Sequence, residues 1–244
     1  MHLIIDSKGN EKIIVYKYDS ETQSNYGIRL VYNEPVDSVF IDIIKEQNLK
    51  YIEFCPSFNQ SIDNLPDCIE TIIFSVNSEF NQPLDNLPSR LKHLELYDEF
   101  NQPLDYLPVG LKTLIINAYF NHPLNNLPST LEYLQIKGEF NYPLDNLPLG
   151  LKKLEIMDIY DNNDHYSNII VRNYDKHITK FSYPLNNLPD GLEYLDISAK
   201  IYNHKITKLP VSMKKLIMHT NYCIDIESLE NLKNKFPNVE ISIL

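Results

Sequence analysis

Apolar and polar residues alternate in a short hexamer that recurs along the chain. In the copy LKHLEL, Leu94 and Leu96 face one way while His93 and Glu95 face the other, because side chains alternate along a strand. Each hexamer is therefore predicted to form a short strand with one buried face. The copies begin at Leu49, Ile69, Leu91, Leu111, Leu131, Leu151, Leu192 and Met213, with a degenerate copy at Phe236.

A nine-residue block lies between successive hexamers. Pro103 and Pro108 in one block remove backbone donors and clash with a preceding helical turn, so the return leg is predicted to be extended. Phe100, Leu104 and Leu107 supply its inward apolar side chains. This block, FNQPLDYLP, begins at Phe100, and related blocks begin at Phe58, Phe80, Phe120, Phe140 and Phe181.

One such unit is too small to fold alone, so the units are predicted to stack into an α/β repeat solenoid with little helix. The hexamers form a parallel β-sheet, and the proline-containing legs form the opposite side. Because strands lie about 4.8 Å apart and the legs are thin, the sheet is expected on the concave side and the extended legs on the convex side.

The two motifs resemble the FNIP repeat, a short leucine-rich-repeat-like unit abundant in proteins of social amoebae and of large viruses that infect amoebae. The resemblance extends over residues 49–218, and the Leu-Pro-x-x-Leu joint is similar to short bacterial leucine-rich repeats that lack a convex helix. It implies a leucine-rich-repeat-like arc that binds proteins. Many relatives carry an F-box that recruits a ubiquitin ligase, but residues 1–48 show no L-P-x-E-I-L opening.

Both ends are predicted to cap the stack. Residues 1–48 form a β/helix cap, with strands at 3–5, 12–18 and 28–32, a turn at 6–10, and then a helix with Pro35 in its first turn. The repeats extend over 49–224, and residues 225–244 form a helix and strand cap. The apolar side chains expected to face the core are Val36, Val39, Phe40, Ile43 and Ile44 in the first helix and Ile226, Leu229 and Leu232 in the second.

Successive hexamers begin 20 to 23 residues apart, except for one interval of 41 after Leu151. The excess is an insertion at about 157–180 that is rich in Asp and Asn. It is predicted to be an exposed loop, with a degenerate extra coil using Val171 and Tyr174 as the alternative. A metal site is disfavoured, because the glycine and distal glutamate of a calcium loop are missing. The side chains that suggest one are Asp158, Asp161, Asp164, His165 and His177.

The outward strand positions form two lanes across the sheet. Exposed tyrosine and isoleucine there suit a protein interface, because aromatic anchors dominate binding energy and exposed apolar patches are seldom idle. High strand propensity and an AT-rich genome explain the same residues without any partner, so both interpretations stay open. The candidate partner-binding residues are Tyr51, His93, Glu95, Ile115, Tyr133, Glu155, Tyr194 and Ile217.

An asparagine directly follows the buried phenylalanine in five blocks. An amide offers two donors and an acceptor, so it can bridge the backbone of adjacent coils where the strand ends. We therefore expect a structural role, and not a ligand site, for Asn59, Asn81, Asn101, Asn121 and Asn141.

Composition narrows the choice of partner. The 22 basic and 33 acidic residues give a formal charge of -11, which disfavours nucleic acid. No apolar stretch approaches the 18 residues of a membrane helix, and the opening lacks the features of a signal peptide. We therefore expect a cytoplasmic protein, in the host cytoplasm if the source is a virus. Cys55, Cys68 and Cys223 match no zinc pattern and are expected to be reduced thiols.

Catalytic motifs are missing from the sequence. There is no G-x-S-x-G and no phosphate-binding glycine loop, and the chain has only six glycines. The sequence predicts a monomeric, non-enzymatic interaction scaffold without a cofactor, which binds an unknown protein on the concave sheet. Two alternatives stay open: a structural or self-assembling component, and a substrate adaptor of a ubiquitin ligase that lacks its own F-box.

Overall fold

The computed structural model describes residues 2–5, 11–20, 23–30, 35–157, 181–185, 187–198, 204, 206, 208–218 and 226–243. The turn predicted at 6–10 lies outside these residues, as does the insertion from residue 158 onward. The side chains that would suggest a metal site and the extra-coil residues Val171 and Tyr174 fall in that insertion.

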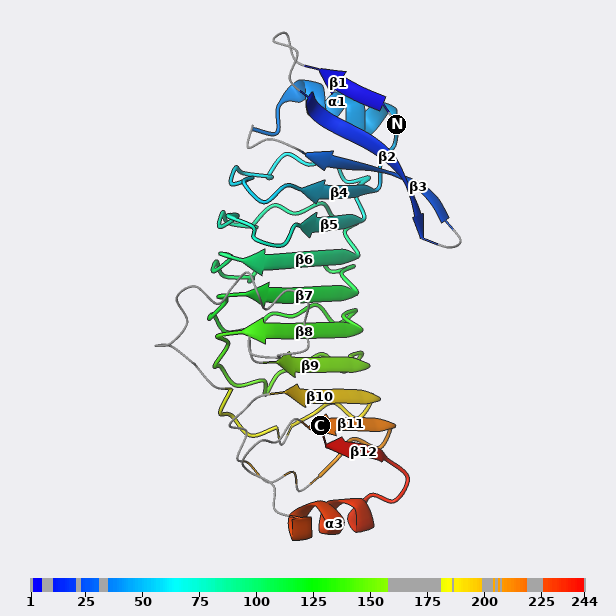
Figure 1. Cartoon of the computed structure of the whole chain (residues 1–244), viewed down its shortest axis with the longest axis vertical. Coiled ribbons are helices and arrows are strands. Elements are labelled where there is room, and N and C mark those ends of the chain that lie inside the picture. Colours follow the sequence, from blue (N-terminus) through cyan, green and yellow to red (C-terminus); the bar gives the residue numbers. More distant parts are fainter. Residues whose placement is uncertain are drawn as a thin grey trace.

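One sheet of twelve strands, in chain order, runs the length of the described part of the molecule (Figure 1). The pairs β1 with β2 and β2 with β3 are antiparallel, and every later neighbouring pair is parallel. The strands are β1 His2–Ile5, β2 Glu11–Ser20, β3 Gln23–Leu30, β4 Tyr51–Phe54, β5 Thr71–Phe74, β6 His93–Asp98, β7 Thr113–Ala118, β8 Tyr133–Gly138, β9 Lys153–Met157, β10 Tyr194–Ser198, β11 Lys215–Met218 and β12 Glu240–Ile243.

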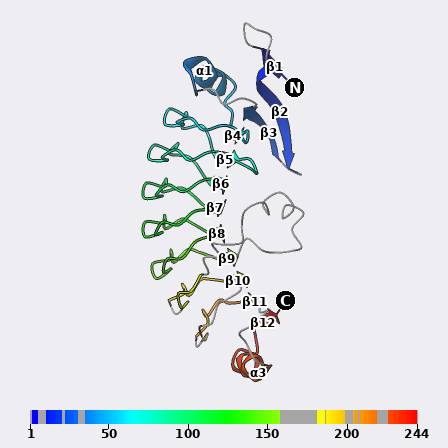
Figure 2. The same cartoon turned by 60° about the vertical axis from the view of Figure 1, so that its left-hand side comes forward.

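The strands have one buried face, as the alternation predicts. In β7, Leu114 and Ile116 are fully buried, whereas Thr113 and Ile115 are half-buried on the other face. Figure 2 shows the strands along the inner side of a curved stack and the return legs along its outer side. The fold is thus the predicted α/β repeat solenoid, a leucine-rich-repeat-like arc with a parallel concave sheet.

Each joint between a leg and the next strand is a tight turn that closes on a proline carbonyl. The Leu111 N–H donates to the Pro108 carbonyl at 3.0 Å, and the same bond recurs in the other joints. The N–H groups of Lys112 and Thr113 then both donate to the carbonyl of Lys92 one coil earlier, at 2.8 and 3.0 Å. The proline that prevents a helix therefore also positions the start of the strand.

Stacked phenylalanine rings form a spine behind the sheet. The ring centroids of Phe80 and Phe100 are 6.0 Å apart, and those of Phe100 and Phe120 and of Phe120 and Phe140 are 6.2 Å apart, with planes within 8° of parallel. These rings are at most 2% exposed. Each ring thus packs against the equivalent rings of both neighbouring coils.

The asparagines after these phenylalanines form a ladder of hydrogen bonds. The Asn101 N–H donates to Asn81 Oδ1 at 2.9 Å, and the Asn121 N–H donates to Asn101 Oδ1 at 3.0 Å. Asn59 and Asn141 accept in the same way from the next coil. The amides therefore bridge adjacent coils beyond the end of the strand ladder.

Strands β9 and β10 are neighbours in the sheet. These two strands pair directly, with Lys153 opposite Tyr194 and Ile156 opposite Ile197. The ring of Phe181 also stacks on that of Phe140, at 6.3 Å. The coil that ends in β9 therefore packs directly on the coil that contains β10.

The first cap contains helix α1, Ser38–Glu46, which begins later than predicted. Pro35 precedes the helix, and Asp37 caps it by accepting the Phe40 N–H on Oδ1 at 2.9 Å. Phe40 and Ile44 are buried, but Val39, which was expected in the apolar face, is 61% exposed. Val39 precedes Phe40 by one residue and is therefore about 100° away from it around the helix, so its side chain points to solvent.

Helix α3, Ile226–Lys235, precedes β12 in the second cap. Leu232 and Phe236 are half-buried and pack against the core of the solenoid. In the described ranges, neither helix has the length and hydrophobicity needed to cross a bilayer.

Substitution in β7 tests the direction of its side chains. Leu114→Asp is expected to lower the free energy of unfolding by more than about 3 kcal/mol, because it buries an unpaired charge in the stack. Thr113→Asp, on the inner face of the sheet, is expected to cost about 0.5 kcal/mol. Urea denaturation measures both; equal losses would mean that the two faces are assigned wrongly.

Removal of one ladder amide tests its role. Asn101→Ala leaves the Asn121 N–H without its acceptor and is expected to cost about 1 kcal/mol of unfolding free energy. Asn126→Ala is the matched control, since its exposed amide makes only a 3.3 Å bond to Asp105. The two midpoints are compared by chemical denaturation, and an equal loss would argue against a structural ladder.

Candidate functional site

The register of the sheet aligns the outward side chains in two continuous lanes. Every neighbour within a lane is a direct partner across adjacent strands. The first lane contains Tyr51, Thr71, His93, Thr113, Tyr133, Lys153, Tyr194 and Lys215. The second contains Glu53, Ile73, Glu95, Ile115, Gln135, Glu155, Asp196 and Ile217.

Individual members of the two lanes differ in how much surface they present. Most members are half-buried, including Ile115 and Ile217. Tyr51, one of the candidate partner-binding residues, is only 8% exposed. It lies opposite Gly27 of β3, and its hydroxyl donates to Glu53 at 3.3 Å. Tyr51 therefore offers little surface to a partner.

Four side chains from the three successive strands β8, β9 and β10 form a cluster on this face. Lys153 Nζ lies over the rings of Tyr133 and Tyr194, at 4.5 and 5.0 Å from their centroids. The same nitrogen is 2.8 Å from Glu155 Oε1, and the Tyr133 hydroxyl donates to Glu155 Oε2 at 2.6 Å. We call Tyr133, Lys153, Glu155 and Tyr194 the tyrosine–lysine cluster. Its members hold one another in place through cation–π and charge-assisted contacts.

Glu95 is the centre of a second group on the same face. Its Oε1 is 2.6 Å from His93 Nε2, and its Oε2 accepts the Tyr97 hydroxyl at 2.9 Å. Burial favours a higher pKa for Glu95, but the hydrogen bond and charge of His93, together with the bond from Tyr97, outweigh burial and lower it. Glu95 therefore stays ionised, and its two carboxylate oxygens already contact His93 and Tyr97.

Burial and nearby carboxylates raise the pKa of both tyrosines in the cluster. The pKa of Tyr194 is raised to about 12, first by burial and then by the charges of Asp196 and Glu155. The pKa of Tyr133 is also raised, by burial and by its hydrogen bond to Glu155. Both hydroxyls are therefore neutral donors at physiological pH.

A third lane on this face was not predicted from the sequence. Strands β6, β7 and β8 extend two residues beyond the hexamer, so Tyr97, Asn117 and Lys137 lie on the same face as the two lanes, beside the second lane. The continued alternation after Leu96 was the available signal. Within the described chain, Asn117 Oδ1 is a buried acceptor without a hydrogen-bond partner.

Metal binding finds no support in the described residues, where no three His, Cys, Asp or Glu side chains come together as a metal site would require. Cys55 is buried and Cys68 is half-buried, and both are free thiols. Cys223 lies outside the described ranges.

The repeats match a known family model. The model described as FNIP Repeat matches residues 80–119 and 104–138, which include β6, β7 and β8. Residues 80–138 therefore contain FNIP repeats. The same blocks recur outside the matched residues, for example at Phe58 and Phe140. The tyrosine–lysine cluster thus begins within the matched FNIP repeats, at Tyr133, and continues into the coils that follow.

The chain is also similar to a solved structure, that of CroV588, described as a novel circular LRR protein. The sequence identity is 23% and the TM-score is 0.44. The similarity covers 88% of this chain and 39% of that one, so this chain spans less than half of its length. No curated protein matches the chain significantly.

The pKa of Tyr194 provides a test of the cluster. We expect it to titrate near pH 12 in the folded protein. Because the folded pKa is raised, the stabilising contribution is present below the unfolded value of 10 and is lost as the pH rises through about 12. Asp196→Asn should lower this pKa by removing a neighbouring charge, as measured by NMR of tyrosine labelled at Cζ. An unchanged titration would contradict the assigned cause.

Proposed function

We propose that this FNIP-repeat chain is an interaction scaffold whose partner protein binds the inner face of the sheet at the tyrosine–lysine cluster. FNIP and leucine-rich-repeat-like folds generally serve as protein-interaction scaffolds and are typically non-enzymatic. The cluster itself carries the proposal, since it holds two half-buried tyrosines together on the inner face of the sheet. Tyrosine in such a position supplies a large contact area and a hydroxyl for hydrogen bonding.

The contacts within the cluster support this site for a second reason. Lys153 and Glu155 hold the rings of Tyr133 and Tyr194 before any partner arrives. A partner would therefore lose less side-chain entropy on binding than it would with freely rotating tyrosines. The half-buried Ile115 and Ile217 extend the apolar part of the surface on either side. We expect a monomer in the cytoplasm that binds a protein and not a nucleic acid.

Affinity capture tests this proposal. The double variant Tyr133→Ala, Tyr194→Ala should recover at least tenfold less of the proteins that the unmodified chain captures from a cell extract. Tyr106→Ala is the matched control, because Tyr106 is 69% exposed on a return leg and should capture normally. Thermal unfolding verifies that all variants are folded. Equal recovery by the double variant would exclude the inner face as the site.

The same samples distinguish the alternatives. Specific enrichment of ubiquitin-ligase subunits would indicate a substrate adaptor. A molar mass that rises with concentration in light scattering would indicate self-assembly. A constant monomer mass, together with loss of capture in the double variant, is the expected result.

A further inference from the structure

The joints at one edge of the sheet carry a charge opposite to that of the whole chain. The four central joints, residues 88–92, 108–112, 128–132 and 148–152, hold four cations and one anion. The joints before and after them, 66–70 and 189–193, each hold two anions and no cation. A basic block is thus bounded by acidic joints in a chain of formal charge -11. Its charged residues are Arg90, Lys92, Lys112, Glu132 and Lys152.

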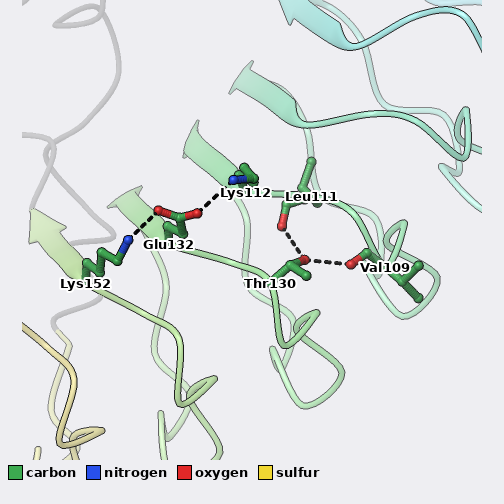
Figure 3. A network of polar contacts seen from close by, with 6 residues as sticks. All are labelled: Val109, Leu111, Lys112, Thr130, Glu132 and Lys152. Carbon is green, nitrogen blue, oxygen red and sulfur yellow. Dashed lines mark hydrogen bonds and ion pairs between the residues drawn. The ribbon is translucent and has the colours of Figure 1, made fainter.

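Lysine and glutamate alternate from coil to coil along this edge, except at one place. Lys50 and Lys92 lie 3.8 and 2.5 Å from the Glu70 carboxylate. Lys112 and Lys152 flank Glu132 in the same way, at 3.0 and 2.8 Å (Figure 3). Between these two triads, Lys92 and Lys112 follow each other with no acid between them.

The interruption leaves an excess of positive charge at the surface. Each of the two lysines binds the glutamate on the side away from the other lysine. Both side chains are 56% exposed, so an additional anion can reach them. Farther along the edge, hydrogen bonds from Lys152 and Lys112 lower the pKa of Glu132 to about 2. A carboxylate between Lys92 and Lys112 would restore the alternation.

Two joints of the basic block carry an exposed apolar side chain. Val109 is 83% exposed and Leu149 is 84% exposed, each directly after the Leu-Pro of its joint. They are two coils apart, which is about 10 Å at the usual strand spacing. Thr130 Oγ1 donates to the carbonyls of Val109 and Leu111, at 2.6 and 2.9 Å, and fixes the first turn to the next coil (Figure 3).

We propose that this edge binds an acidic, extended segment of a partner protein, with a carboxylate between Lys92 and Lys112 and apolar side chains on Val109 and Leu149. An extended chain of the polyproline-II type has three residues per turn, so residues three apart lie on the same side, about 9 Å apart, close to the spacing of the two apolar side chains. Charge complementarity selects an acidic segment, and the apolar contacts add area that charge alone does not supply. This surface is separate from the inner face and does not depend on the function proposed for it.

Peptide binding tests the chemistry of the surface. The probe is a fluorescein-labelled hexapeptide, Glu-Leu-Glu-Glu-Leu-Glu, with its leucines three residues apart, and anisotropy measures its affinity for the full chain. Two control peptides replace every glutamate by lysine or both leucines by serine. We expect the acidic leucine peptide to bind at least tenfold more tightly than either control, and to weaken as salt is raised because exposed charges are screened.

Variants of the protein test the position of the surface. Lys112→Gln should weaken peptide binding about tenfold, whereas Lys214→Gln, at the same position of a coil outside the block, should not. Lys214 pairs with Glu193 much as Lys112 pairs with Glu132. The double variant Val109→Ser, Leu149→Ser should also weaken binding about tenfold. It is expected to fold, because Ser89 and Ser129 occupy the same position in their own joints.

Several results would overturn the proposal. They are the absence of binding at millimolar peptide, equal binding of the acidic and basic peptides, and undiminished binding by both the Lys112 variant and the serine variant. The Tyr133→Ala, Tyr194→Ala variant should bind the acidic peptide normally. If it alone lost the peptide, the binding would belong to the inner face.

Discussion

Stacking of each coil on the next is the interaction on which the whole structure depends. A coil of about 20 residues has no core of its own, so Phe100 is buried only because Phe80 and Phe120 cover it. The amide of Asn101 likewise finds its partner in the next coil. Both contacts require equivalent residues at equivalent heights, and this requirement explains why the nine-residue block varies so little along the chain.

The same constraint leaves the outward positions free to vary. Inward residues such as Leu94, Leu114 and Leu134 are nearly identical in every strand because they share one packed layer. Their outward neighbours range from threonine to lysine and tyrosine. Side chains far apart in the sequence thereby meet, as Tyr133 and Tyr194 meet around Lys153. A rigid repeat thus presents different chemistry in each coil without a change in its backbone.

Alternation and spacing predicted the parallel sheet, its buried face and the members of both lanes, because one register relates all of these features. They could not predict the burial of Tyr51, which results from the pairing of β3 with β4 in the cap. Helix α1 begins later than the sequence predicts, because its first residue is set by the N-cap at Asp37 and not by Pro35. The hexamer is shorter than strands β6, β7 and β8, so its pattern alone does not predict the third lane. Each lysine of the ion-pair triads contacts a glutamate of a neighbouring coil. The composition of the chain does not determine which glutamate that is.

The two surfaces follow from the two kinds of position that stacking leaves free. Inner-face side chains are flanked by neighbours on both sides, so their charges are mostly satisfied within the sheet, as with Glu95 and Glu155. A partner on that face would therefore contact mainly the surface of its aromatic side chains. Joint residues lie at the edge of the sheet and are more exposed. Several successive joints can therefore form a basic surface even though the whole chain is acidic. Since both surfaces belong to one rigid stack, a partner on the inner face and an acidic segment on the edge could be held at a fixed separation.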